Sequence, residues 1–265
     1  MDDGIDCVER IPFSFRAEDM ALEEGMEKCI VLFSGGQDSA TCLLYALKHY
    51  GCVVTMGFRY GQRHDVELRA REDLLCALRN ERADLAEHLG KDVVLALGDY
   101  EKIAHNALTG HEDIRLKENG IPNTFVPGRN LLFLCYAGSL AYDMGAEDII
   151  CGVGEADYSG YPDCRETTMA SMEQSLTLGL GRTIRIQTPL MHRTKAETWQ
   201  MALEMGGEWA VDWIVRRSHT CYEGDHEHWH EWGYGCGKCP ACILRRRGWK
   251  EFKDKESKGL ESVRG

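Results

Sequence analysis

Short β-type segments that alternate with helical stretches constrain this fold more than any other feature of the sequence. The first segment, CIVLF at 29–33, is apolar throughout, which is typical of a strand buried on both faces of a sheet. Further strands are expected at 52–58, 92–97, 148–153 and 183–188. The stretches between them predict helices over 39–49, 64–89, 128–145, 168–179 and 194–206. Strands that alternate with helices predict an α/β fold with a doubly wound, mainly parallel sheet.

A glycine-rich turn, SGGQDS at 34–39, joins the first strand to the first helix. In open parallel sheets ligands bind beyond the C-terminal strand ends, where backbone N–H groups and a helix N-terminus form an anion site. Ser34 and Ser39 can donate hydrogen bonds to phosphate, and Asp38 suits such a site if it holds Mg²⁺ or caps the helix. The turn lacks the Gly-Lys-Ser/Thr of a Walker A loop. We therefore expect it to hold pyrophosphate as a leaving group; a purely structural turn is the alternative.

Twelve cysteines are many for a chain in a reducing compartment, where disulfides rarely persist. Eight of them are scattered singly and are expected to be small buried residues. The other four have the spacing C-x14-C-x2-C-x2-C, and they are Cys221, Cys236, Cys239 and Cys242. Four convergent thiolates with no open position predict one structural Zn²⁺ per chain, with an iron–sulfur cluster as the lesser option.

The stretch between the first two of these cysteines, 222–235, carries three histidines: His226, His228 and His230. They could compete with the cysteines as metal ligands. A polar surface loop is the favoured interpretation, because the four cysteines already complete a tetrahedral set.

Charge and hydropathy exclude several classes of protein. The net charge of −12 argues against broad binding to nucleic acid, which needs a basic face. The basic stretch LRRRGWK at 244–250 is interpreted as a solvated helix end. No segment reaches the about 18 apolar residues of a membrane span, and the acidic start of the chain lacks a signal-peptide hydrophobic region. We therefore expect a cytoplasmic protein that does not bind a membrane.

Several strings resemble one family of enzymes. LFSGGQDSATCL resembles the pyrophosphate loop of the N-type ATP pyrophosphatases, whose fold is of the adenine nucleotide alpha hydrolase type. More narrowly, six strings resemble the 7-cyano-7-deazaguanine synthases: YGQRH (60–64), GIPNTFVPGRN (120–130), YSGYPDCR (158–165), TPL (188–190), KAETW (195–199) and CGKCPAC (236–242). The resemblance runs in order from about residue 29 to about residue 250.

The resemblance implies an ATP-dependent carbon–nitrogen ligase. Its substrates would be 7-carboxy-7-deazaguanine, ammonium and Mg²⁺-ATP, and its product 7-cyano-7-deazaguanine, a precursor of queuosine or a related modification. The carboxylate and then the amide would be adenylated, with release of AMP and pyrophosphate. The resemblance also implies a homodimer, with no direct contact to nucleic acid.

The resemblance further implies functional residues. Asp38 and Ser39 would be catalytic. The ATP-binding residues would be Phe33, Ser34, Gly35, Gly36, Gln37, Asp38, Ser39, Ala40, Thr41, Cys42 and Leu43. Residues near the phosphates or the substrate would be Arg63, Arg129, Asn130, Asp157, Tyr158, Asp163 and Arg165. An ordinary helix start or turn remains an alternative for most of this last group.

The chain departs from the family pattern at two places. Arg59 stands where the family usually has an acid, and the gap at 222–235 is longer than usual. Lys195 could contact phosphate, but it is slightly favoured as a plain helix start.

Four regions are expected along the chain. They are an N-terminal extension (1–27), the ATP pyrophosphatase-type α/β domain (28–210), the zinc-binding region (211–250) and a charged, frayed tail (251–265). Residues 99–125 are expected to be rich in loops.

Two other functions stay open at this point. One is another adenylating enzyme of the same superfamily, such as a tRNA thiolase or an amidotransferase-type synthetase. The other is a zinc-bearing module that binds nucleotide or nucleic acid without catalysis.

Overall fold

The computed structural model describes residues 26–61, 66–98, 100, 123–155 and 161–264. Most of the expected extension at 1–27, and most of the loop-rich stretch at 99–125, lies outside these residues.

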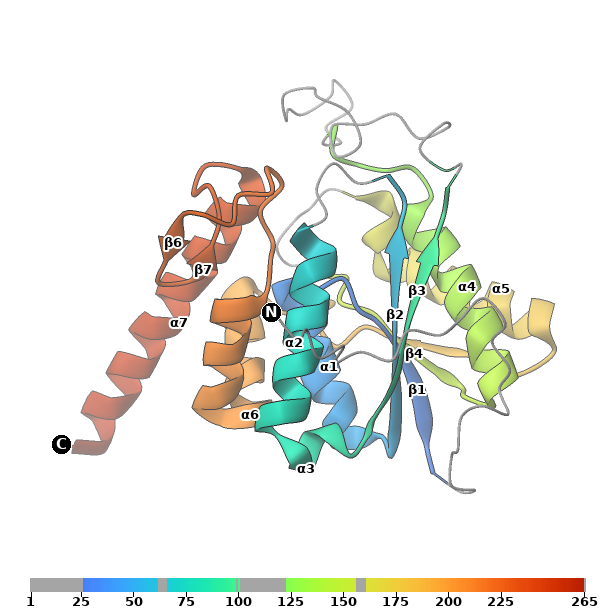
Figure 1. Cartoon of the computed structure of the whole chain (residues 1–265), viewed down its shortest axis with the longest axis horizontal. Helices are drawn as coiled ribbons and strands as arrows, with labels where there is room; N and C mark the ends of the chain where they lie inside the picture. The colour runs from blue at the N-terminus through green and yellow to red at the C-terminus, as the bar shows by residue number, and fades with distance from the viewer. Residues whose placement is uncertain (1–25, 62–65, 99, 101–122, 156–160, 265) are drawn as a thin grey trace, which may run out of the picture.

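A five-stranded parallel sheet forms the centre of the fold, with strand order β3-β2-β1-β4-β5 (Figure 1). The strands are β1 (Lys28–Leu32), β2 (Cys52–Arg59), β3 (Leu89–Ala96), β4 (Asp148–Ile150) and β5 (Arg185–Gln187). The chain adds strands on one side of β1 and then on the other, so a crevice opens beyond the C-terminal ends of β1 and β4. The predicted α/β fold with a parallel sheet is confirmed.

Helices cover both faces of this sheet, each over its own apolar cluster (Figure 1). One layer contains α1 (Gln37–His49), α2 (Val66–Glu81), the short α3 (Ala83–Ala86) and α6 (Lys195–Arg217). The other layer contains α4 (Arg129–Met144) and α5 (Glu166–Leu180), with a 3-10 turn, η3 (Pro162–Cys164), before α5. The core therefore lies in two slabs, one on each side of the strands.

Several predicted ends differ in the structure. The helix predicted over 64–89 ends at Glu81, and the short α3 and the start of β3 at Leu89 occupy its last third. The helix predicted to end at 206 does lose helical geometry at Gly207, whose φ is 68° and ψ −164°, but a second helical stretch follows directly and extends α6 to Arg217. The strand predicted over 148–153 ends at Ile150, and the next residues leave the sheet to line a cavity.

The charged C-terminal stretch, expected to be frayed from 251, is instead part of one long helix, α7 (Pro240–Arg264). This helix lies along α6 on the side away from the sheet (Figure 1). Its apolar side chains hold it there, because Phe252 is buried in the cluster between the two helices and Trp249 packs against Trp199. The many charges that suggested fraying belong to the solvated face of an amphipathic helix.

Between α6 and α7 the chain forms a small region with a two-stranded antiparallel ribbon, β6 (Trp229–His230) and β7 (Gly233–Tyr234). Its buried apolar cluster consists of Cys221, Trp232, Cys239, Ala241 and Cys242. Across the described part of the chain, no helix combines the length and the apolar character that crossing a membrane requires.

Candidate active site

A cavity of about 360 Å³ lies at the C-terminal ends of β1, β2 and β4. Its floor is formed by the ends of these strands, and its walls come from the SGGQDS turn, α2, α4, the start of α6 and the segment at 219–222 that contains the first of the four cysteines. This is the position expected for a ligand site in an open parallel sheet.

The hydroxyl of Ser39 organises the turn at 34–39. Its Oγ accepts hydrogen bonds from the backbone N–H groups of Ser34 and Gly35, both at 3.2 Å, and donates to the carbonyl of Gly36 at 3.1 Å. The Oγ of Ser34 lies 3.1 Å from it. One side chain from the first turn of α1 thus holds the loop that precedes it, and the start of the helix faces the cavity.

Gly35 is fixed by main-chain atoms on two sides. Its φ is +89°, and a Cβ there would lie 2.7 Å from the carbonyl oxygen of Glu67 and 2.9 Å from the nitrogen of Arg71. Its own carbonyl accepts a hydrogen bond from the N–H of His219, at 3.0 Å. The turn is therefore held between α2 and the segment that leads to the cysteines.

A lysine reaches this turn from another helix. Lys195, the first residue of α6, donates to both carboxylate oxygens of Asp38, with N–O distances of 2.7 and 2.6 Å. A capping box fixes the start of α6, because Thr194 accepts from the N–H of Glu197 and the Glu197 carboxylate accepts from the N–H of Thr194. The positive charge that the turn itself lacks is therefore present beside it.

The opposite wall carries a second cation, Arg129, from the first turn of α4. Its Nη1 donates to the hydroxyl of Tyr60 at 3.1 Å, while its buried Nε has no hydrogen-bond partner within the described residues. Burial lowers the pKa of Arg129, but Tyr60, Tyr161 and the nearby acids raise it by more. Arg129 is thus a permanent cation with donor capacity to spare at the cavity wall.

Glu67, in the first turn of α2, lines the same cavity as these two cations. Burial raises the pKa of its carboxyl group, and the positive charge of Arg129 offsets only part of that rise.

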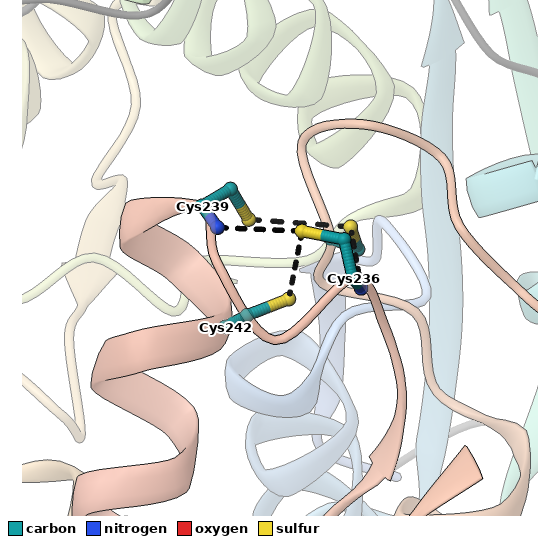
Figure 2. Close-up of side chains that lie close together, drawn as sticks. Cys236, Cys239 and Cys242 are labelled. Carbon is teal, nitrogen blue, oxygen red and sulfur yellow. Dashed lines mark hydrogen bonds between the residues drawn. The ribbon is translucent and has the colours of Figure 1, made fainter. Parts of the chain in front are cut away.

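The four cysteines converge at the start of α7 (Figure 2). All four Sγ atoms lie within 4.8 Å of one another; the Cys236–Cys242 pair is 3.9 Å apart and the Cys221–Cys239 pair 4.0 Å. Four sulfurs at about 2.3 Å from a tetrahedral ion would be about 3.8 Å apart, so the set fits one metal ion. Backbone N–H groups of Lys238 and Cys239 also point at the sulfur of Cys236, at 3.4 and 3.3 Å.

The three histidines between the first two cysteines lie outside this sulfur set, as expected for a surface loop. His226 and His228 are exposed, and His230 is bonded through Nε2 to the carbonyl of Gly235 at 2.8 Å. The metal-ligating group found among the described residues contains only the four cysteines.

Comparison with known proteins identifies the family of the chain. Residues 28–253 match the family model described as queuosine biosynthesis protein QueC. The chain belongs to the QueC family.

QueC relatives of known name are similar over nearly their whole length. A 7-cyano-7-deazaguanine synthase of Zymomonas mobilis is 51% identical over 87% of this chain and 91% of that protein. Relatives with the same name from Bordetella pertussis and Nitrobacter winogradskyi are 49% and 50% identical, covering 87% and 88% of this chain and 95% and 98% of theirs.

Among solved structures, a complex of a 4-thiouridine synthetase with RNA and bound ATP aligns over 86% of this chain and 51% of that chain. The TM-score is 0.48 and the identity 17%, too low for that structure to bear on this chain's function.

The structure brings part of the predicted nucleotide site of this QueC protein to the cavity. The lining includes Phe33, Ser34, Gly36, Gln37, Asp38 and Ser39. Gln37 is buried, and both polar atoms of its amide lack partners within the described residues. The later predicted residues, Ala40, Thr41, Cys42 and Leu43, are buried in α1 and do not line the cavity.

The predicted substrate residues divide into three groups. Arg129 and Asn130 line the cavity, whereas Asp163 is buried behind it and accepts a hydrogen bond from the N–H of Asn130 at 3.2 Å. Arg165 is exposed at the start of α5 and is not part of the lining. The remaining three, Arg63, Asp157 and Tyr158, lie outside the described residues.

Sequence reasoning missed Arg71, the buried cation beneath the turn. Its guanidinium donates to the carbonyl of Phe33 and pairs with Asp92, which also accepts from Thr55 at 2.7 Å. Gly57 makes the space, because a Cβ there would lie 2.6 Å from the guanidinium. A glycine inside an otherwise apolar strand was the available signal.

Proposed function

We propose that this chain is a 7-cyano-7-deazaguanine synthase, which converts 7-carboxy-7-deazaguanine, ammonium and two ATP to the nitrile, two AMP and two pyrophosphate. The observation that carries the proposal is that the SGGQDS turn and the Arg129 cation open onto one cavity in a chain of the QueC family. An anion-binding turn facing a carboxylate-binding cation is the arrangement that adenylation of a carboxylate needs.

The turn would hold the phosphates of ATP. The N–H groups of the first turn of α1, which have no partner within their own helix, would offer hydrogen bonds to the β- and γ-phosphates. Lys195 would contact the phosphates from α6, which explains how the turn can work without a lysine of its own. Asp38, which pairs with Lys195 in the structure, would hold the Mg²⁺ that offsets the phosphate charge when ATP is bound.

The far wall would hold the deazaguanine substrate. Arg129 has the charge and the free donors to receive its carboxylate. Tyr60, Phe133 and Tyr161 also line the cavity, and they offer aromatic faces for a purine-like ring.

The chemistry then proceeds in two rounds. A carboxylate oxygen attacks the α-phosphorus, and the bond from that phosphorus to pyrophosphate breaks. Ammonia attacks the acyl adenylate and AMP leaves, which gives the amide. In the second round the amide oxygen attacks another α-phosphorus with loss of pyrophosphate; loss of the nitrogen-bound protons and of AMP then gives the nitrile. The residues contribute orientation and charge stabilisation.

The four cysteines would hold one structural Zn²⁺ with no open position for chemistry. A free base as product fits an acidic protein that need not bind tRNA directly. A homodimer in the cytoplasm completes the proposal.

One reaction tests the proposal. Purified protein is mixed with Mg²⁺-ATP, ammonium and 7-carboxy-7-deazaguanine; AMP is followed by chromatography and the base by mass spectrometry. We expect AMP together with a product of nitrile mass. Asp38→Ala should lower the rate by about 100-fold or more with the fold intact, because it removes a charge that acts on the transferring phosphate.

The matched control is Asp212→Ala, which removes an exposed carboxylate on α6 and should keep full activity. AMP without the nitrile would indicate a different substrate for the same adenylating site. No AMP from folded, metal-replete protein would contradict the proposal, and normal turnover by Asp38→Ala would remove Asp38 from the mechanism.

A further inference from the structure

The carboxyl group of Glu67 is the feature of the cavity wall that has no role in the proposal so far. Among the described residues, only two carboxylates line the cavity, Asp38 and Glu67. Asp38 is paired with Lys195, whereas the Glu67 carboxylate has no hydrogen bond or ion pair within the described residues. A carboxylate that faces a cavity without a partner is available to a ligand.

The backbone places Glu67 close to the site of adenylation. Its carbonyl oxygen lies 2.7 Å from the position of a Cβ at Gly35, so the first turn of α2 is in direct contact with the SGGQDS turn. Arg129, the candidate carboxylate-binding residue, is near enough to act electrostatically on Glu67 from the opposite wall. Glu67 therefore lines the cavity next to the SGGQDS turn and within electrostatic range of Arg129.

The surroundings make Glu67 a better proton acceptor than an ordinary surface carboxylate. Burial raises the pKa of its carboxyl group, while the guanidinium of Arg129 acts in the opposite direction. Arg71 lies on the same helix. The other charged or titratable groups of the cavity wall are Asp38, Tyr60, Arg129, Tyr161, Cys151, Cys164, Arg193, Lys195, His219, Cys221 and Tyr222.

The proposed reaction needs such an acceptor. Ammonia, like other amines, is almost fully protonated to ammonium near neutral pH. Ammonium has no lone pair with which to attack an acyl adenylate. Lys195 beside the turn and Arg129 on the opposite wall are cations that repel ammonium. Glu67 offers the negative charge that would draw it in.

We propose that Glu67 binds the ammonium ion in this cavity and takes one of its protons, so that ammonia is formed beside the acyl adenylate. This inference rests on the proposed function. An N–H bond of ammonium breaks, its electron pair stays on nitrogen, and the proton moves to a carboxylate oxygen of Glu67. The nitrogen then bonds to the acyl carbon and the carbon–oxygen bond to AMP breaks. The second proton lost from nitrogen passes to water, and Glu67 releases its own proton in the same way.

The test separates adenylation from use of ammonium. Glu67→Gln keeps the size and hydrogen-bonding capacity of the side chain but removes the charge and the basicity. We expect kcat/KM for ammonium to fall by about 100-fold or more, as for the loss of a general base. The exchange of pyrophosphate into ATP that depends on the carboxylate substrate should stay within about twofold, because that step does not use ammonium. The matched control Asp73→Asn, exposed on the same helix, should leave both rates unchanged.

Two further readouts distinguish a base from a residue that only supports the wall. Hydroxylamine, a nucleophile that is largely uncharged near neutral pH, should form its adduct equally fast with both forms of the protein. The ammonium-dependent rate of Glu67→Gln should rise in proportion to free ammonia as the pH increases, while the wild-type rate should depend on pH less steeply.

Equal use of ammonium by Glu67→Gln and the wild type would overturn the inference while the synthase proposal stands. A parallel loss of exchange and of ammonium use would also overturn it, because Glu67 would then only position the site. Wild-type protein without substrate-dependent exchange would contradict the proposed function, and the inference with it.

Discussion

The α/β body and the cysteine region, residues 219–242, are held together in different ways. The body buries apolar side chains on both faces of its sheet, including whole indole rings such as those of Trp199 and Trp213. The apolar cluster of the cysteine region has five buried residues, of which three are cysteines. A region with so few apolar residues cannot offset the entropy of ordering its chain by burial alone, so we expect its fold to depend on a metal ion that crosslinks the sulfurs.

The two regions nevertheless share the candidate active site. The N–H of His219 bonds to the carbonyl of Gly35, and Arg245 of α7 donates to Thr220 at 2.9 Å and to Ile214 at 3.3 Å. One wall of the candidate site thus belongs to the cysteine region, which has little apolar core of its own. The rest of the site is built on the α/β body, which has a large one. Variants of each region should fail differently.

Loss of the metal should have the largest effect. Cys239→Ser removes one of four ligands, and structural metal sites of this kind contribute on the order of 10 kcal/mol to folding of the segment that carries them. We expect loss of bound metal by elemental analysis and loss of solubility, with proteolysis starting within 219–242 while the sheet keeps its circular dichroism. Cys135→Ser, an exposed cysteine on α4, is the control and should change none of these. A soluble, metal-free and fully active Cys239→Ser protein would contradict the comparison.

A break inside the body should destabilise the whole domain and spare the metal. Arg71→Met leaves Asp92 as a buried charge without its partner, which typically costs about 3–5 kcal/mol. Urea denaturation should show this loss as one cooperative transition, with the metal content unchanged. Arg69→Met, exposed on the same helix, should cost little. If Arg71→Met released the metal before the sheet unfolded, the stability of the cysteine region would depend on the α/β body, which would contradict the comparison.

The smallest effect is expected at the start of α6. Thr194→Ala removes the capping box and should cost about 1 kcal/mol in urea denaturation. The metal should stay bound, but KM for ATP should rise because Lys195 begins the same helix. Ser171→Ala on α5 is a control that removes an exposed hydroxyl. An unchanged KM for ATP would show that the cap does not position Lys195.

Local pattern was sufficient to predict most of the sheet. CIVLF is apolar because β1 is covered on both faces of the sheet. The four cysteines could be predicted to converge because their spacing along the chain is typical of the ligands of one metal ion. Boundaries were less predictable, since β3 begins at Leu89 rather than 92 and the charged end of α7 forms helix where fraying was expected. In both places, packing against a distant element decides the backbone.

The pairings within the site could not be derived from local pattern. Asp38 and Lys195 are 157 residues apart, and each alone has an ordinary explanation as a helix-start residue. Arg71 is one of several charges on a helix, and nothing nearby in the sequence marks it as the one that is buried. Such partners become apparent only when the sheet brings separate strand ends together.

Gly35 has a consequence for the thermodynamics of nucleotide binding. Its backbone is in contact with α2 on one side and bonded to His219 on the other, and even a methyl group does not fit between. The turn is thus ordered before any ligand arrives, so the entropy of arranging its N–H groups is lost during folding and not during association. ATP should therefore meet a preorganised turn, and its binding should carry no entropic penalty for ordering that turn.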